Sequence, residues 1–192
     1  MNTLKQASKI LPLPLLEHIG IIVTFFRTTE PFVAKNKFIL NYNYDLKTKP
    51  EIYITSLNDN FKEWFLPKIE KPMAKTMLEY KRLTRSSVNG PIMRELRIKE
   101  LKDERETTLA QIYTLMECQK NEELSVLLVR GANIFYVPDV KGILRVVFVF
   151  QHPDSNGWFI YAREVTNQRA WDRNDRIFFR SERCSCSHRI VI

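Results

Sequence analysis

The clearest pattern in the sequence is a series of short apolar runs separated by short polar turns, beginning at Ser125. The runs are rich in Val, Ile, Phe and Tyr, residues that favour strands. Because such short connections bring consecutive strands side by side, the pattern predicts an antiparallel β-meander of four or five strands. The predicted strands are Ser125–Val129, Ile134–Val137, Ile143–Phe150, Trp158–Tyr161 and Arg176–Phe179.

The turn 154–157 suggests a register for two of these strands. If Phe150 faces Trp158 across the turn, then Arg145 faces Arg163 on the same face of the sheet. Like charges directly opposite each other destabilise a sheet. The sequence therefore predicts either an acidic group or anionic ligand between the two guanidinium groups, or a register shifted by one residue.

Helical spacing replaces the alternation in the middle of the chain. Phe61, Trp64 and Phe65 fall on one face of a helix whose N-cap is Asn58 or Asp59. A proline two residues beyond this apolar group ends or bends the helix. The segment therefore predicts a short helix packed against a core.

Three further helices are expected before the meander. The first covers about Glu70–Leu83, the second runs from Pro91 to about Asp103, and the third begins at Thr107 or Thr108. The third helix presents an apolar face that needs a core to pack against. That face consists of Leu109, Ile112, Tyr113 and Met116.

Three strand-like segments precede the helices, at Gly20–Phe26, Phe38–Tyr44 and Glu51–Thr55. The predicted fold class is α+β, with central helices and a C-terminal four- to five-stranded antiparallel β-meander.

The same patterns suggest how the chain is divided. Residues 1–85 form an N-terminal β/α section that could be a separate lobe, and residues 86–192 contain helices and the C-terminal sheet. The segment Ser86–Gly90 has the composition of a linker and is the expected border.

Composition narrows the classes of function. The chain has 192 residues and a formal net charge of +8, which favours a polyanion partner such as nucleic acid. Only five glycines occur, and no glycine-rich run that would form a phosphate-binding loop is present.

Three cysteines are too few for a disulfide framework, and the apolar run Ile19–Phe26 is too short to cross a membrane. We therefore expect a cytoplasmic protein.

The expected binding residues are Arg145, Arg163 and Tyr161, together with Trp171 and Arg173. Guanidinium groups suit phosphate or carboxylate, and aromatic rings can stack on bases. The alternative is that carboxylates such as Glu164 and Glu123 neutralise the arginines. The loop around Trp171 could instead carry an aromatic anchor for a protein partner.

Metal chemistry has weaker support in the sequence. Cys184, Cys186 and His188 alternate, so their side chains would point the same way in an extended tail. Zinc sites usually carry wider cysteine spacing and need a fourth ligand, so we expect no metal and no cofactor.

The function expected from these observations is a non-catalytic intracellular binding module for an anionic macromolecule, such as nucleic acid, or for a protein partner. One alternative is a small metal-dependent nuclease or related hydrolase, whose carboxylates would be Asp139, Glu164, Asp172 and Asp175. Another is an oligomer-forming structural protein, because Ile143–Phe150 is apolar on both faces of its predicted strand.

Overall fold

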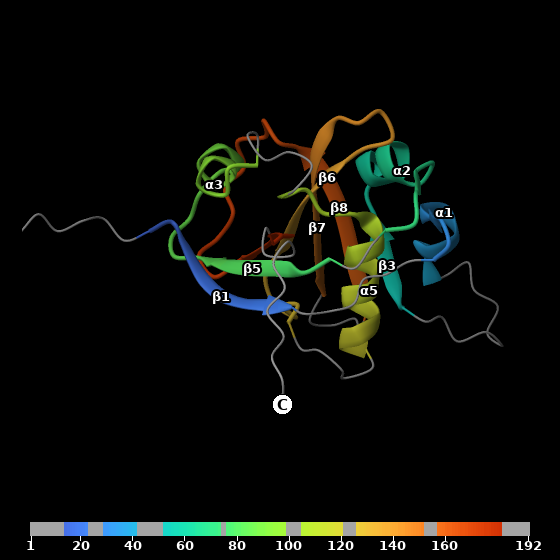
Figure 1. Ribbon diagram of the computed structural model, residues 1–192, viewed down its shortest axis with the longest axis horizontal. Coiled ribbons are helices and arrows are strands. Elements are labelled where there is room, and N and C mark those ends of the chain that lie inside the picture. Colours follow the sequence, from blue (N-terminus) through green and yellow to red (C-terminus); the bar gives the residue numbers. More distant parts are fainter. Residues whose placement is uncertain are drawn as a thin grey trace, which may run out of the picture.

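A seven-stranded mixed sheet forms the centre of the molecule (Figure 1). The computed structural model describes residues 14–22, 29–41, 52–73, 76–98, 105–120, 126–151 and 157–181. The strand order is β1-β5-β9-β6-β7-β8-β3, and a separate two-stranded sheet pairs β2 with β4. The strands of the large sheet are β1 (Leu16–Ile22), β3 (Ile54–Leu57), β5 (Leu78–Leu83), β6 (Asn133–Pro138), β7 (Leu144–Gln151), β8 (Trp158–Glu164) and β9 (Arg176–Arg180).

The remaining elements are short apart from one helix. The small sheet consists of β2 (Phe32–Val33) and β4 (Ile69–Glu70). The helices are α1 (Ala34–Lys37), α2 (Asp59–Phe65), α3 (Asn89–Glu95) and α5 (Leu109–Lys120). Figure 1 shows α3 on one side of the molecule and α1 and α2 on the other. Among the described residues, no helix has the length and apolarity needed to span a bilayer.

The predicted architecture of central helices followed by an antiparallel meander is wrong. Strands β6, β7 and β8 do pair as antiparallel neighbours. However, β9 runs parallel to β6, and β8 pairs in parallel with β3 on its other edge. Strands β1, β3 and β5, which all precede residue 86, lie in the same sheet as the C-terminal strands. The described part of the predicted strand Ser125–Val129 forms a loop, in which the Asn133 side chain bonds the backbone of Leu128.

The predicted helix Glu70–Leu83 is also wrong, because its second half is strand β5. Leu78 is buried in one apolar cluster and Leu83 in another, and β1 and β9 hydrogen-bond to the two edges of the strand. The Tyr80 ring stacks on Phe178 of β9, with 5.5 Å between the centroids. These partners are distant in sequence, so local helical spacing could not indicate them.

Several other strands and helices begin or end at residues that differ from the predicted ones. Strand β1 begins four residues before the predicted start at Gly20, and β3 begins at Ile54. The predicted strand Phe38–Tyr44 is wrong over its described part, which follows helix α1, and residues 42–44 lie outside the described residues. Helix α3 ends at Glu95, well before the predicted end, and Arg97 adopts a left-handed φ of 56°.

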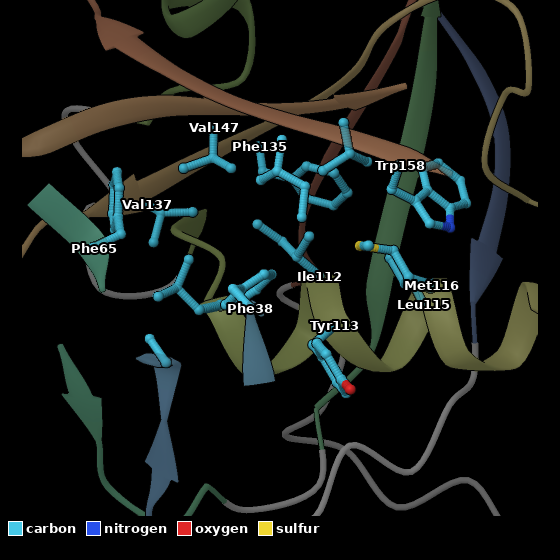
Figure 2. Packing of buried hydrophobic residues seen from close by; sticks show 14 of the residues in the cluster. Phe38, Phe65, Ile112, Tyr113, Leu115, Met116, Phe135, Val137, Val147 and Trp158 are labelled. Atoms are coloured by element: carbon cyan, nitrogen blue, oxygen red, sulfur yellow. The ribbon is translucent and has the colours of Figure 1, made fainter. Parts of the chain in front are cut away.

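Helix α5 covers one face of the large sheet, as its apolar spacing predicted. In Figure 2, Ile112 and Met116 point toward strands that carry Phe135 and Val147, while Tyr113 points away from the sheet. The first apolar cluster therefore fills the space between this helix and the sheet.

A second apolar cluster covers the other face. Tyr136 of β6, Val146 of β7 and Ile177 of β9 pack with Ile92 of α3 and with Trp171. Because both faces of β6, and of β7 at Val146 and Val147, are covered within the chain, these segments read as nearly continuous apolar runs.

Two side chains fix the starts of helices. Asn58 is the N-cap of α2, where its Oδ1 accepts a hydrogen bond from the Phe61 amide, as the sequence predicted. Glu70 of β4 performs a similar role for α5, because its two carboxylate oxygens accept from the Leu109 and Ala110 amides at 3.0 and 2.9 Å. Lys68 neutralises this carboxylate at 3.1 Å.

Candidate functional site

The register between β7 and β8 differs by one residue from the predicted one. Phe150 pairs with Phe159 instead of Trp158. Side chains of paired residues share a face and consecutive side chains alternate, so the shift places Arg145 and Arg163 on opposite faces of the sheet. The predicted pair of guanidinium groups therefore does not exist.

Arg145 is a structural residue on the α2 side of the sheet. It lies opposite Glu164, whose Oε1 is 3.2 Å from Nη1, and its Nε donates to Asp139 Oδ2 at 3.1 Å. The guanidinium carbon lies 4.0 Å from the centroid of the Trp64 ring. Carboxylates thus neutralise Arg145, which is the alternative that the sequence left open.

Asp139 is buried and organises the turn before β7. Its Oδ1 accepts from the amides of Lys141 and Ile143 at 2.8 and 2.9 Å. Burial alone raises the pKa of this carboxyl, but hydrogen bonds from Ile143, Arg145 and Lys141 outweigh burial and hold the pKa below its ordinary value.

Arg163 lies on the opposite face in a different environment. It is 8% exposed, and its guanidinium carbon lies 3.4 Å from the Trp171 centroid and 5.5 Å from the Phe148 centroid. Its Nη2 donates to the carbonyl of Arg169 at 3.1 Å, while its buried Nε has no partner among the described residues. No carboxylate of the described part of the chain forms an ion pair with Arg163.

Burial lowers the pKa of Arg163 to about 10, and the nearby Arg169 adds to this effect. The group still carries its charge at neutral pH. A desolvated cation without an ion pair costs free energy unless other contacts offset that cost.

Trp171 is held rigidly beneath this guanidinium. Its Nε1 donates to Asn89 Oδ1 at 2.7 Å, and its backbone forms an antiparallel bridge with Ser87. The ring is only 4% exposed, so Trp171 is not an exposed anchor for a protein partner.

Half-buried aromatic rings continue this face away from Arg163. Phe148 and Phe150 of β7 and Phe159 and Tyr161 of β8 share it, because Phe148 pairs with Tyr161 and Phe150 with Phe159. Phe150 stacks on Phe159 at 5.3 Å and meets Tyr161 edge-on at 5.5 Å. We name these four residues the aromatic face.

A cleft of about 500 Å³ opens between the aromatic face and the segment 169–175. Arg163 and Trp171 form one part of its wall, and Gly131 and Ala132 another. Its complete lining is Gly131, Ala132, Phe148, Phe150, Tyr161, Arg163, Arg169, Ala170, Trp171, Asp172 and Asp175.

Asp175 also lines the cleft. Its carboxylate oxygens accept from the amides of Ala132 and Asp172, at 2.8 and 2.9 Å. Burial raises the pKa of the Asp175 carboxyl, although these two hydrogen bonds oppose the shift. Asn174 makes the turn possible by adopting a φ of 79°.

The remaining candidate residues are Arg173 and the possible metal ligands near the C-terminus. Arg173 is exposed in the turn beside the cleft. Cys184, Cys186 and His188 lie outside the described residues. Within the part of the chain that the structure describes, no three His, Cys, Asp or Glu side chains gather as a metal site would require.

The four carboxylates of the nuclease alternative lie in two separate groups. Asp139 and Glu164 bind Arg145 on the α2 side, whereas Asp172 and Asp175 lie at the cleft on the other side. A two-metal or single-metal centre built from all four is therefore wrong.

The sequence places Tyr161 and Arg163 on one face of the sheet, but it does not place Phe148 and Phe150 there. The available signal was the unfavourable pairing of two arginines, which indicated a register shifted by one residue. That shift brings the two phenylalanines onto the same face as Tyr161.

Comparisons with protein-family models, with curated proteins and with solved structures found no match to this chain.

Proposed function

We propose that the chain is a non-catalytic module that binds single-stranded nucleic acid across the aromatic face. The observation that carries the proposal is the grouping of four half-buried aromatic rings on adjacent strands, beside a desolvated arginine without an ion pair. Stacking of a base on an aromatic side chain contributes about 1–3 kcal/mol and tolerates any base, because every base has a π-face.

Charge around the cleft supports the same ligand. Arg173 is exposed in the segment that borders the cleft, and the exposed Arg130 precedes Gly131 of its wall; neither arginine is part of the lining. The chain as a whole carries a net charge of +8. Exposed arginines suit contacts with successive phosphates of a strand whose bases lie on the rings.

The test is a fluorescence-anisotropy titration of the full chain with labelled single-stranded oligonucleotides of mixed sequence, at several salt concentrations. The proposal predicts that the logarithm of the binding constant falls linearly with the logarithm of the salt concentration. Each phosphate contact adds about 0.7 to the slope for a single strand. Arg130→Ala and Arg173→Ala should therefore each reduce the slope by up to that amount.

A matched control is Arg94→Ala, which removes an exposed arginine from α3, outside the lining of the cleft. It should leave the slope unchanged. Absence of measurable binding at the lowest salt concentration contradicts the proposal, and so does an equal loss of slope in the control variant.

A further inference from the structure

The charges that line the cleft indicate which part of a nucleotide it accepts. Arg163 and Arg169 contribute two positive charges, and Asp172 and Asp175 contribute two negative ones. These charges cancel, so the cleft does not offer the excess positive charge that a phosphate requires. A neutral group with both hydrogen-bond acceptors and donors matches this lining better.

Arg163 supplies the donors for such a group. A guanidinium has five N–H groups in a planar fork, and the described residues account for one of them, through the carbonyl of Arg169. Stacking on Trp171 fixes the plane of the fork. A fixed fork of this kind fits two acceptors that lie side by side on one edge of a base.

Two carboxylates supply acceptors to the same cleft. Asp172 is exposed, and each oxygen of Asp175 accepts a single backbone hydrogen bond although it has two lone pairs. A base that presents both acceptors and N–H groups would therefore find partners for both among the lining residues.

We infer that the cleft selects guanine from the single strand bound to the aromatic face. Guanine presents O6 and N7 as adjacent acceptors, the pair that an arginine fork reads, and it presents N1–H and the 2-amino group as donors on its other edge. Adenine places a donor beside N7, and the pyrimidines lack N7 altogether. The half-buried rings of Phe148, Phe150 and Tyr161 provide apolar walls for the planar base.

This inference rests on the proposed function and is tested with four labelled oligodeoxythymidines that differ only at one central position. That position carries guanine, 7-deazaguanine, hypoxanthine or adenine. One well-formed bidentate contact discriminates by about 5- to 150-fold. We expect guanine to bind at least fivefold tighter than adenine, and 7-deazaguanine to lose most of that advantage because it lacks N7. Hypoxanthine, which lacks the 2-amino group, should bind more weakly than guanine.

The variant Arg163→Lys keeps the charge and removes the fork. It should bind the four oligonucleotides with nearly equal affinity, whereas Arg94→Lys should keep the guanine preference. If Arg163→Lys does not fold, the comparison of guanine with 7-deazaguanine on the wild-type protein still decides the question.

The outcomes separate the two proposals. Equal affinity of the wild-type protein for all four oligonucleotides, or a preference for adenine, overturns guanine selection and leaves binding on the aromatic face intact. Failure to bind any of them overturns both.

Discussion

The guanidinium carbon of Arg163 lies 3.4 Å from the centroid of the Trp171 ring. Trp171 in turn donates to Asn89, so the stacked pair is anchored to helix α3 on the covered side of the sheet. A cation stacked on an aromatic ring gains about 0.5–2 kcal/mol, which offsets part of the cost of desolvation. The pairing therefore holds a charged, donor-rich group at the cleft without an ion pair.

Trp171→Phe tests this anchoring. The substitution keeps an aromatic ring beneath Arg163 but removes the hydrogen bond to Asn89, leaving a buried acceptor with fewer partners. We expect the free energy of unfolding to fall by about 1–3 kcal/mol, as measured by urea denaturation. A variant as stable as the wild type would show that the bond contributes nothing.

The aromatic face should carry most of the affinity for a single strand. Phe150→Ala and Tyr161→Ala should each weaken binding by about 1–3 kcal/mol, equivalent to roughly 5- to 150-fold, in the anisotropy titration. Trp64→Leu is the matched control, because Trp64 is a half-buried aromatic residue on the other face of the sheet. If all three variants lose affinity equally, the effect reflects folding and not stacking.

Local patterns predicted the elements whose partners lie nearby in sequence. Helix α2 with its Asn58 cap, helix α5 and the antiparallel trio β6, β7 and β8 are confirmed. The predicted helix over strand β5 is wrong, because the stability of this strand comes from β1 and β9, which no local spacing reveals. Parallel contacts such as β3 with β8 are likewise set by long-range packing.

The candidate site was predictable only in part. A one-residue error in the register of β7 and β8 exchanges the two faces of a strand, so it separates Arg145 from Arg163. The sequence could not show that the carboxylates of Asp139 and Glu164 lie against Arg145, because the three come together only when the turn and both strands have formed. Asp175 is a possible metal ligand only in the nuclease alternative, whereas in the structure it lines the cleft.

Asp139→Asn should destabilise the fold at neutral pH. The substitution removes the buried negative charge beside Arg145 and weakens the bonds to the Lys141 and Ile143 amides. Loss of one partner of a buried ion pair costs about 3–5 kcal/mol of unfolding free energy. We expect the lower half of this range, because Glu164 still contacts Arg145. Asp59→Asn, at an exposed pair with Lys62, should cost less than about 1 kcal/mol.

The stability difference between the wild type and Asp139→Asn should depend on pH. The pKa of Asp139 is lower in the folded than in the unfolded state, so its contribution is present above the unfolded pKa of about 3.9 and is lost as pH falls through the folded pKa. The difference in unfolding free energy between wild type and Asp139→Asn should therefore be constant from pH 5 to 7 and shrink below about pH 4. Urea denaturation across this range measures it, and a difference that grows on acidification contradicts the assignment.

Glu70→Gln tests the cap that β4 provides for helix α5. A neutral amide offers one acceptor to the two amides of Leu109 and Ala110 and leaves Lys68 without its counter-ion. We expect a loss of about 1–3 kcal/mol in unfolding free energy. Glu63→Gln, at an exposed position of α2, should be within about 0.5 kcal/mol of wild type, and equal losses in both variants would mean that the cap is dispensable.

The most direct measurement of the central claim is photo-crosslinking of the full chain to a single-stranded oligonucleotide that carries 5-iodouracil, followed by mass spectrometry of the crosslinked peptides. This base crosslinks to aromatic side chains on which it stacks. Binding on the aromatic face predicts crosslinks to Phe148, Phe150, Phe159 or Tyr161. Crosslinks confined to the opposite face of the sheet, for example to Trp64, would contradict it.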